Sequence, residues 1–103
     1  MTKEDFEQLV LTEHEESCSI LSRKATEYAG KEDRLLNFKQ AAGLRSINSV
    51  EAAMGMLTKH FVSVSDMAKN PIKYPIEQWD EKLRDIRNYT YLIKGLLIDM
   101  GAI

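Results

Sequence analysis

The sequence predicts an all-α protein: a helical bundle of three long helices and one short helix in a single domain, residues 1–103. Apolar residues recur every three or four positions over long stretches, and no stretch alternates apolar and polar residues as a strand would. Glycines and prolines interrupt the pattern near residue 30, over 43–48 and over 70–75, which divides the chain into helix-sized segments.

The first helix is predicted to begin after Thr2, a residue type that caps helix N-termini well, with Asp5 at the reciprocal capping position. It is expected to run to about Ala29, because Gly30 favours the left-handed conformation that ends helices. A polar turn over residues 30–33 should follow.

A short second helix and a long third helix are predicted next. Asp33 is expected to cap the second helix, which should end at Gly43. Asn48 and Glu51 form a capping-box pattern for the third helix, which should reach about Ala68. Its apolar stripe has helical spacing and consists of Val50, Ala53, Met54, Leu57, Phe61, Val64 and Ala68.

The last helix is predicted to carry Pro75 in its first turn, followed by Glu77 and Asp80 near the positive end of the helix dipole. Apolar residues then recur at steps of three and four, which predicts a packing seam. The seam consists of Ile76, Trp79, Leu83, Ile86, Thr90, Ile93 and Leu97.

Composition and charge exclude several classes of protein. The chain has 103 residues, is 44% hydrophobic, and balances 14 Lys and Arg against 16 Asp and Glu, which argues against bulk electrostatic binding of nucleic acid. A single Cys18 excludes an internal disulfide and a cysteine zinc cluster. The sequence lacks the pattern of a signal peptide or a membrane span, so a soluble cytoplasmic protein is expected.

We also expect a homo-oligomer. A domain this small with such long helices buries little surface by itself, and small bundles often gain stability by pairing. Four apolar residues lie off the predicted stripes and would be exposed in a monomer, namely Met56, Val62, Tyr91 and Ile98.

Asp85 is the first candidate functional residue. Helical spacing places it at the edge of the apolar face formed by Tyr89, Leu92 and Leu96, where a carboxylate must be paired, hydrogen-bonded or bound to a metal. Lys82 lies one turn earlier on the same side. The structural alternative is therefore an ion pair of Asp85 with Lys82 or an arginine, which would fix the helix register.

Polar residues also interrupt the apolar stripe of the first helix, at Glu13, His14, Glu16 and Ser17. Glu13 and Glu16 have the spacing that places two carboxylates on one helix face, as divalent metal sites use, although a solvated acidic face has the same pattern. His60 is expected to be a packing or capping residue, and Cys18 a small core residue.

Three segments resemble a known family: Lys24-x-x-Glu27-Tyr28-Ala29, then residues 33–38 (DRLLNF), then residues 79–89 (WDEKLRDIRNY). In order and spacing they are similar to small phage and prophage proteins of the nucleotide modification associated domain 1 group. That group is distantly related to the MazG-like all-α nucleoside triphosphate pyrophosphohydrolases. The likeness covers residues 24–97.

The resemblance implies a helical bundle, oligomeric assembly and Mg²⁺-dependent cleavage of a nucleotide between its α and β phosphates. Asp85 and Glu81 would be the catalytic residues and would hold the metal, with Glu13 or Glu16 contributed by the first helix. The remaining expected nucleotide contacts are Lys24, Asp33, Asn37, Lys82 and Asn88. The sequence departs from the pyrophosphohydrolase pattern at Lys82, which stands where a second acid would be expected.

Two functions are therefore predicted. The first is a phage-type protein that binds a nucleotide or acts as a nucleotide pyrophosphohydrolase. The second is a catalytically silent module that binds a host or phage protein, for example to inhibit a host defence system. Nucleic-acid binding through Arg84, Arg87 and Lys94 on an outer basic face ranks last, because acidic residues lie close by.

Overall fold

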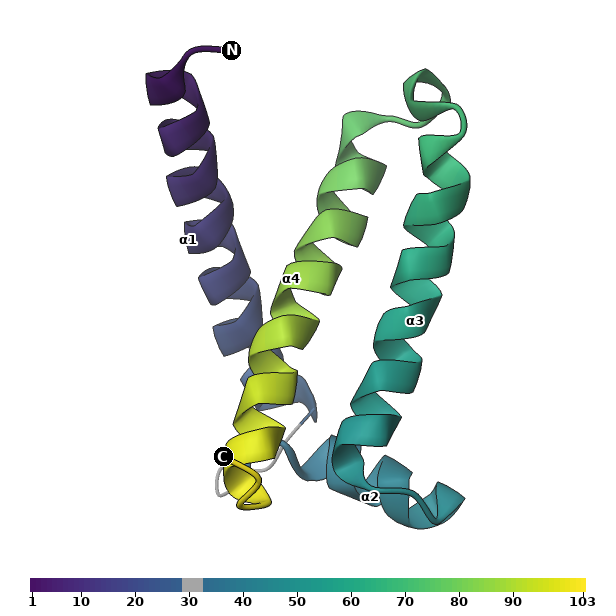
Figure 1. The fold of residues 1–103 in the computed structure, drawn as a ribbon. Helices are drawn as coiled ribbons and strands as arrows, with labels where there is room; N and C mark the ends of the chain where they lie inside the picture. The colour runs from purple at the N-terminus through teal and green to yellow at the C-terminus, as the bar shows by residue number, and fades with distance from the viewer. Residues whose placement is uncertain (29–32) are drawn as a thin grey trace.

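The computed structural model describes residues 1–28 and 33–103, with the side chains of 24–28 left out. Within that part of the chain, four α-helices and one short 3₁₀ turn form the fold, and no strand occurs. The helices are α1 (Lys3–Tyr28), α2 (Leu36–Arg45), α3 (Ser49–Ala68) and α4 (Ile76–Asp99), with the 3₁₀ turn at Pro71–Lys73. The all-α prediction is confirmed (Figure 1).

Two of the helix starts that the sequence predicts from capping residues, those of α1 and α3, are confirmed. The Asp5 backbone N–H donates to Thr2 Oγ1 at 3.0 Å, so Thr2 caps α1. At α3 both halves of the capping box are present, because Glu51 N–H donates to Asn48 Oδ1 at 2.8 Å and Asn48 N–H donates to Glu51 Oε1 at 3.3 Å. The expected α1 terminus at Ala29 and Gly30 and the turn over 30–32 lie outside the described residues.

The predicted ends of α2 are wrong by two or three residues. Asp33 Oδ1 accepts from the Leu35 backbone N–H at 3.0 Å, but Leu35 is the N-cap residue, so Asp33 lies in the preceding turn. Gly43 lies inside the helix, which ends where Ser46 adopts a φ of 55°. Ser46 N–H donates to Gly43 O, and Ile47 N–H donates to Ala42 O, the pair of bonds that closes a Schellman motif. Because the residue at this position is a serine, the sequence contains no glycine that would indicate the end of the helix.

The hydrophobic core lies where α2, α3 and α4 meet. Phe38, Ala53 and Leu96 form its centre, and six partly buried residues pack around it: Leu35, Val50, Met56, Tyr89, Leu92 and Ile93. Met56 was expected to be exposed and instead covers this core, because α2 packs against the start of α3. Val62, Tyr91 and Ile98 are exposed, as expected.

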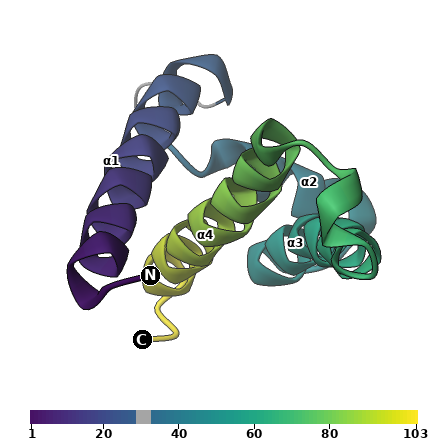
Figure 2. The same cartoon turned by 90° about the horizontal axis from the view of Figure 1, so that it is seen from above.

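The predicted seam of α4 is confirmed only in part. Ile93 packs against the core, and Trp79, Ile86 and Leu97 are partly buried. Ile76, Leu83 and Thr90 are exposed, whereas the buried residues of α4 are Asn88 and Leu96. Pro75 is the N-cap residue, one position before the first turn in which it was expected. The buried side of α4 differs from the predicted seam because α3 covers the side with Asn88 and Leu96. Helix α1 crosses α4 only near its middle, as Figures 1 and 2 show.

None of the described helices combines the length and the apolar character needed to cross a membrane.

The start of α2 is tied to the end of α4 by one lysine and two carboxylates. Lys39 Nζ lies 2.8 Å from Asp33 Oδ2 and 3.0 Å from Asp99 Oδ2. The hydrogen bond from Lys39 and the Leu35 backbone N–H lower the pKa of Asp33 below 3.8. The hydrogen bonds to Asp33 and Asp99 raise the pKa of Lys39 above 10.5.

The stabilising effect of this pair should depend on pH at both extremes. Because the pKa of Asp33 is lowered by folding, its contribution is present at neutral pH and disappears as pH falls through the folded pKa, below 3.8. Because the pKa of Lys39 is raised, its contribution disappears as pH rises through the folded pKa, above 10.5. Asp33→Asn should thus lower the Tm at pH 7, with a gap from wild type that closes at acidic and at strongly alkaline pH.

Thermal unfolding followed by circular dichroism from pH 2.5 to 11 measures this gap. Asp66→Asn is the control, because Asp66 is exposed and paired with Lys69 at 3.6 Å on the same helix. A gap between Asp33→Asn and wild type that is the same at every pH would contradict the assignment.

Candidate functional site

A cleft of about 270 Å³ opens between α2 and α4, beside the hydrophobic core. We name it the α2–α4 cleft. Its lining consists of Leu21 from α1, Arg34 from the turn before α2, Asn37 and Phe38 from α2, and Asp85, Asn88, Tyr89 and Leu92 from α4. The mixture of apolar walls and a few polar groups is typical of small-molecule sites.

Helical spacing explains why these residues share one cleft. The four α4 residues stand at positions i, i+3, i+4 and i+7, which lie on one face of a helix. Asn37 and Phe38 begin α2, and Phe38 belongs to the core, which holds the start of α2 against α4. The polar groups of the cleft therefore lie beside the hydrophobic core.

Two asparagines in the cleft have buried oxygens without hydrogen-bond partners. Asn88 is 6% exposed, and its Oδ1 accepts no hydrogen bond; the buried Oδ1 of Asn37 accepts none either. Leaving a buried amide oxygen unpaired costs about 1–3 kcal/mol, so such groups are uncommon. Their presence together indicates a place where a ligand would supply the missing donors or a cation.

Asp85 lies between this cleft and a histidine of α3. Its Oδ2 is 3.7 Å from His60 Nδ1, and the two side chains are 18% and 21% exposed. That distance is too long for a hydrogen bond, and His60 Nδ1 is buried without one. The His60 ring is also 5.4 Å from the Tyr89 ring, centroid to centroid. Among the described residues, His60 is the basic side chain that approaches the Asp85 carboxylate, and neither Lys82 nor an arginine pairs with it.

The other predicted nucleotide and metal residues of α2 and α4 lie outside the lining of the cleft. Glu81 is exposed, one turn before Asp85, and Lys82 is half-buried. Asp33 is engaged by Lys39. The side chain of Lys24 is outside the described part of the structure. Of the predicted set, the structure thus brings Asn37, Asp85 and Asn88 together.

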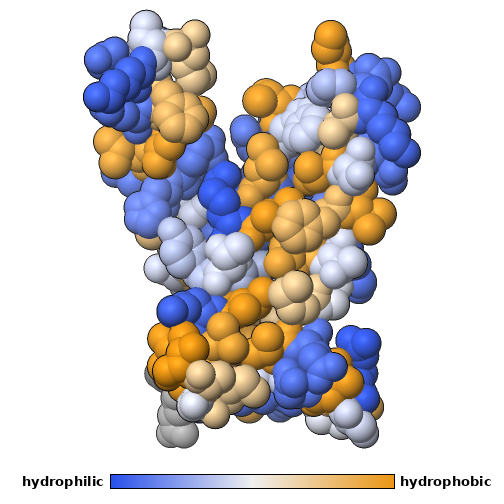
Figure 3. Space-filling view, viewed as in Figure 1, coloured by the Kyte–Doolittle hydropathy of each residue, from blue (hydrophilic) through white to orange (hydrophobic). Residues whose placement is uncertain are grey.

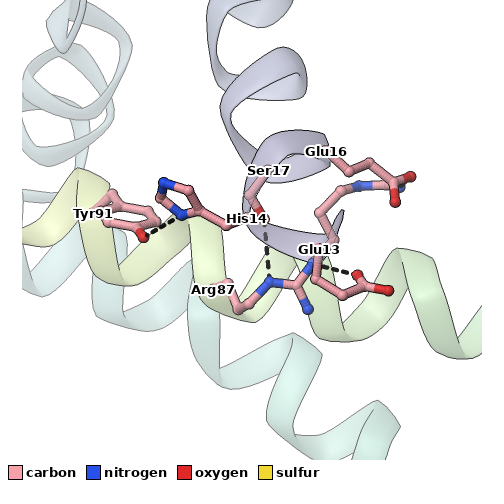
Figure 4. Close-up of polar contacts among 7 residues, drawn as sticks. Glu13, His14, Glu16, Ser17, Arg87 and Tyr91 are labelled. Atoms are coloured by element: carbon pink, nitrogen blue, oxygen red, sulfur yellow. Dashed lines mark hydrogen bonds and ion pairs between the residues drawn. The ribbon is translucent and has the colours of Figure 1, made fainter. Parts of the chain in front are cut away.

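Glu13 and Glu16 lie at the crossing of α1 and α4, where each pairs with an arginine (Figure 4). Arg87 Nη2 donates to Glu13 Oε2 at 2.9 Å, and Arg84 Nη1 donates to Glu16 Oε1 at 2.7 Å. Arg87 Nε also donates to the Oγ of Ser17, which is 1% exposed. The expected outer basic face is therefore wrong for both arginines, because they point toward α1.

His14 and Cys18 complete this crossing. The Tyr91 hydroxyl lies 3.3 Å from His14 Nδ1, and Cys18 Sγ lies 3.7 Å from His14 Nε2. Cys18 is exposed, so the prediction that it is a core residue is wrong. The buried small residue of this stretch is Ser17, one position earlier. The polar interruption of the first helix is thus a tertiary contact between α1 and α4.

No group of three or more His, Cys, Asp or Glu side chains that could hold a metal occurs among the described residues. The α2–α4 cleft instead offers one carboxylate and two amide oxygens, the hard oxygen ligands that Mg²⁺ takes. Magnesium commonly uses one or two carboxylates and completes its shell with water and substrate phosphates. The donor types in the cleft, one carboxylate and two amide oxygens, are therefore types that magnesium accepts.

The remaining groups of the cleft define what else it can bind. Arg34 carries a permanent positive charge and forms no ion pair with another described residue, so its guanidinium is available for an anion. Tyr89, which is half-buried, supplies aromatic surface on which a flat ring can stack. A nucleotide has an anionic phosphate group, which binds a cation, and a planar base. The cleft offers a group for each of these three.

Arg34, which lines the cleft, and His60, which lies beside Asp85 outside the lining, are residues to which the sequence analysis gave no role in binding. His60 reaches Asp85 from another helix, and no local pattern encodes such a contact. Arg34 lies beside Asp33 in residues 33–38, one of the segments that carry the family resemblance. The sequence could therefore have pointed to Arg34, although no role was assigned to it.

Comparisons of the chain with protein-family models, with curated proteins and with solved structures found no match. The resemblance stated above therefore stays a prediction.

Proposed function

We propose that the chain binds a nucleotide in the α2–α4 cleft, with Mg²⁺ between the nucleotide phosphates and Asp85. The observation that carries this proposal is the pair of buried, unpaired amide oxygens, on Asn37 and Asn88, in the same cleft as the Asp85 carboxylate. Two buried amide oxygens that lack hydrogen-bond donors, beside a carboxylate, fit a cation better than they fit a structural role.

Each residue then has a distinct task. Asp85 supplies the charged oxygen ligand, and Asn37 and Asn88 supply neutral ones. Arg34 neutralises phosphate charge that the metal leaves uncompensated. Tyr89 presents its ring for stacking with the base. When bound, magnesium would supply charge neutralisation of the phosphates and polarisation of a phosphoryl oxygen.

Binding is better supported than hydrolysis. Two-metal cleavage of a phosphoanhydride needs several carboxylates close together, and the described residues bring one to the cleft. Among the predicted metal ligands, Glu81 lies nearest to Asp85 in the sequence, one helical turn before it. Its side chain is exposed and would have to turn toward the metal to supply a second carboxylate. Cleavage between the α and β phosphates is the activity that the resemblance adds to this proposal.

The test is a titration of the protein with the common NTPs and dNTPs, with and without Mg²⁺, followed by calorimetry and by thermal unfolding. One or more nucleotides should bind only with Mg²⁺ and raise the Tm by an amount that grows with ligand concentration. Asp85→Asn keeps the side-chain shape and removes the charge, so it should weaken Mg²⁺-dependent binding by at least about 10-fold.

Asp66→Asn is the matched control, because Asp66 is a carboxylate on the surface of α3 and is not among the residues that line the cleft. Analysis of the products for monophosphate in the same samples separates binding from cleavage. If no nucleotide changes the Tm or releases heat, the proposal is wrong.

The alternative function, a silent module that binds another protein, draws support from the exposed apolar side chains, such as Leu44 at 89% and Ile72 at 95%. It requires neither metal nor nucleotide. A partner recovered from host lysate by the wild type, and equally by Asp85→Asn, would favour this second candidate.

A further inference from the structure

One face of α1 carries a histidine and a cysteine one helical turn apart. His14 and Cys18 stand at positions i and i+4, so their side chains lie one above the other. Cys18 Sγ is 3.7 Å from His14 Nε2, and both side chains are exposed. A thiolate sulfur and an imidazole nitrogen are ligands that zinc binds well.

The separation of these two atoms suits a single tetrahedral metal ion. Zinc binds a cysteine sulfur at about 2.3 Å and a histidine nitrogen at about 2.0 Å, so two such ligands in a tetrahedral shell lie about 3.5 Å apart. The 3.7 Å between Cys18 Sγ and His14 Nε2 is close to this value. The helix therefore already holds both side chains at the spacing of two ligands of one ion.

Tyr91 of α4 holds the His14 ring in an orientation that suits a metal ligand. The Tyr91 hydroxyl lies 3.3 Å from His14 Nδ1, so the two ring nitrogens have different neighbours (Figure 4). A metal-ligating histidine commonly donates its other ring N–H to an oxygen, which fixes the tautomer that leaves a lone pair for the metal. With the proton on Nδ1, the ring donates to the Tyr91 hydroxyl oxygen and keeps the Nε2 lone pair toward Cys18.

We propose that Cys18 and His14, in this tautomer, chelate one Zn²⁺ ion, with water in the remaining coordination positions. On binding, the Cys18 thiol releases its proton to solvent, and the thiolate sulfur and His14 Nε2 form the two bonds from the protein to the metal. The exposure of both side chains leaves room for the water ligands. The pair shares no residue with the α2–α4 cleft, so this inference does not rest on the proposed function.

The bound metal acts on the helix that has few contacts with the rest of the protein. Every residue from 1 to 12 is exposed, and Figure 3 shows the N-terminal part of α1 standing apart from the rest of the molecule. A helix with few tertiary contacts is only marginally stable in water. A metal that joins His14 to Cys18 fixes one turn of α1 at its crossing with α4, so metal binding stabilises this helix.

A titration of the reduced, metal-free, full-length protein with Co²⁺ tests the proposal, because a bond between Co²⁺ and a thiolate gives a charge-transfer absorption band. The band should saturate at one Co²⁺ per chain and disappear when Zn²⁺ is added, since Zn²⁺ favours tetrahedral sulfur and nitrogen ligands. Mg²⁺ should leave the band unchanged, because Mg²⁺ takes oxygen ligands. Zn²⁺ should also slow hydrogen exchange of the backbone amides of residues 14–18.

Three substitutions of exposed residues identify the groups that act on the metal. His14→Gln should weaken Co²⁺ binding by at least about 100-fold, and Tyr91→Phe, which removes only the hydroxyl, by about 10-fold. Glu7→Gln is the control, because it removes a carboxylate of the same helix that pairs with Lys3, and it should leave the band unchanged. The proposal is wrong if the wild type gives no band, if His14→Gln binds Co²⁺ as tightly as the wild type, or if Glu7→Gln abolishes the band. Unchanged binding by Tyr91→Phe would overturn the assigned tautomer.

Discussion

Asn88→Leu is expected to raise the Tm of the free protein and to abolish nucleotide binding. The Asn88 side chain is buried at 6% exposure, its Oδ1 has no donor, and its neighbours in the cleft include Phe38 and Leu92. Removing an unpaired buried amide relieves a cost of about 1–3 kcal/mol, and leucine has a similar size. Even the lower value corresponds to a rise in Tm of roughly 4–8 °C for a domain of this length.

Asn48→Leu is the matched control, because it makes the same change at an asparagine that is fully engaged. Asn48 Oδ1 accepts from the Glu51 backbone N–H at 2.8 Å and caps α3, so its loss should lower stability by about 1 kcal/mol. Thermal unfolding measures the change in Tm for each substitution. Changes of opposite sign would indicate that the Asn88 amide serves ligand binding, whereas the Asn48 amide stabilises the fold.

The outcome that contradicts this prediction is also clear. If Asn88→Leu lowers the Tm as Asn48→Leu does, Asn88 stabilises the fold. The main observation in favour of ligand binding in the cleft is then removed. A rise in Tm with unchanged nucleotide binding would place the ligand elsewhere. Residues that reduce stability while they support binding are expected at functional sites, because selection there acts on activity.

The parts of this fold that the sequence predicts well are those set by neighbouring residues. Thr2 and Asn48 cap helices through bonds to residues three positions away, so the starts of α1 and α3 could be predicted from local patterns. The end of α2 could not, because Ser46 adopts the left-handed conformation without the glycine that usually marks it.

The orientation of α4 depends on contacts that sequence spacing does not contain. The helix has two faces with apolar residues, and only the position of α3 and the crossing of α1 decide that Leu96 is buried while Leu83 is exposed. The predicted seam followed the more regular of the two faces. Asn88 interrupts the other face, and there its burial reflects the cleft rather than the periodicity.

The candidate site was predictable in part for the same reason. Asp85 was named from its helical position at the edge of an apolar face, and Asn37 and Asn88 from the family resemblance. The structure places all three in one cleft. Glu13 and Glu16 were placed near a metal because their spacing is suitable, but spacing does not say what lies opposite, and arginines of α4 do. His60 needs the packing of α3 on α4 to meet Asp85.

The last prediction concerns what holds α1 to the rest of the protein. Arg87→Ala is expected to loosen α1 around the crossing, because this arginine donates to both Glu13 and Ser17. Its removal leaves the Ser17 hydroxyl buried without that donor and the Glu13 carboxylate, which is 25% exposed, without its ion-pair partner. Hydrogen bonds to charged groups contribute about 1.5–3 kcal/mol, which corresponds to roughly 10- to 150-fold faster local opening.

Hydrogen exchange of the backbone amides of residues 13–23, compared with those of α3, measures this opening. Lys94→Ala is the control, since Lys94 is an exposed cation on the same helix that forms no ion pair with another described residue. Exchange in α3 should change little, because α3 packs on the core and not on α1. Equal acceleration in α1 and α3 would mean that Arg87 stabilises the whole domain, whereas no acceleration would mean that the apolar residues near Leu21 hold α1 without it.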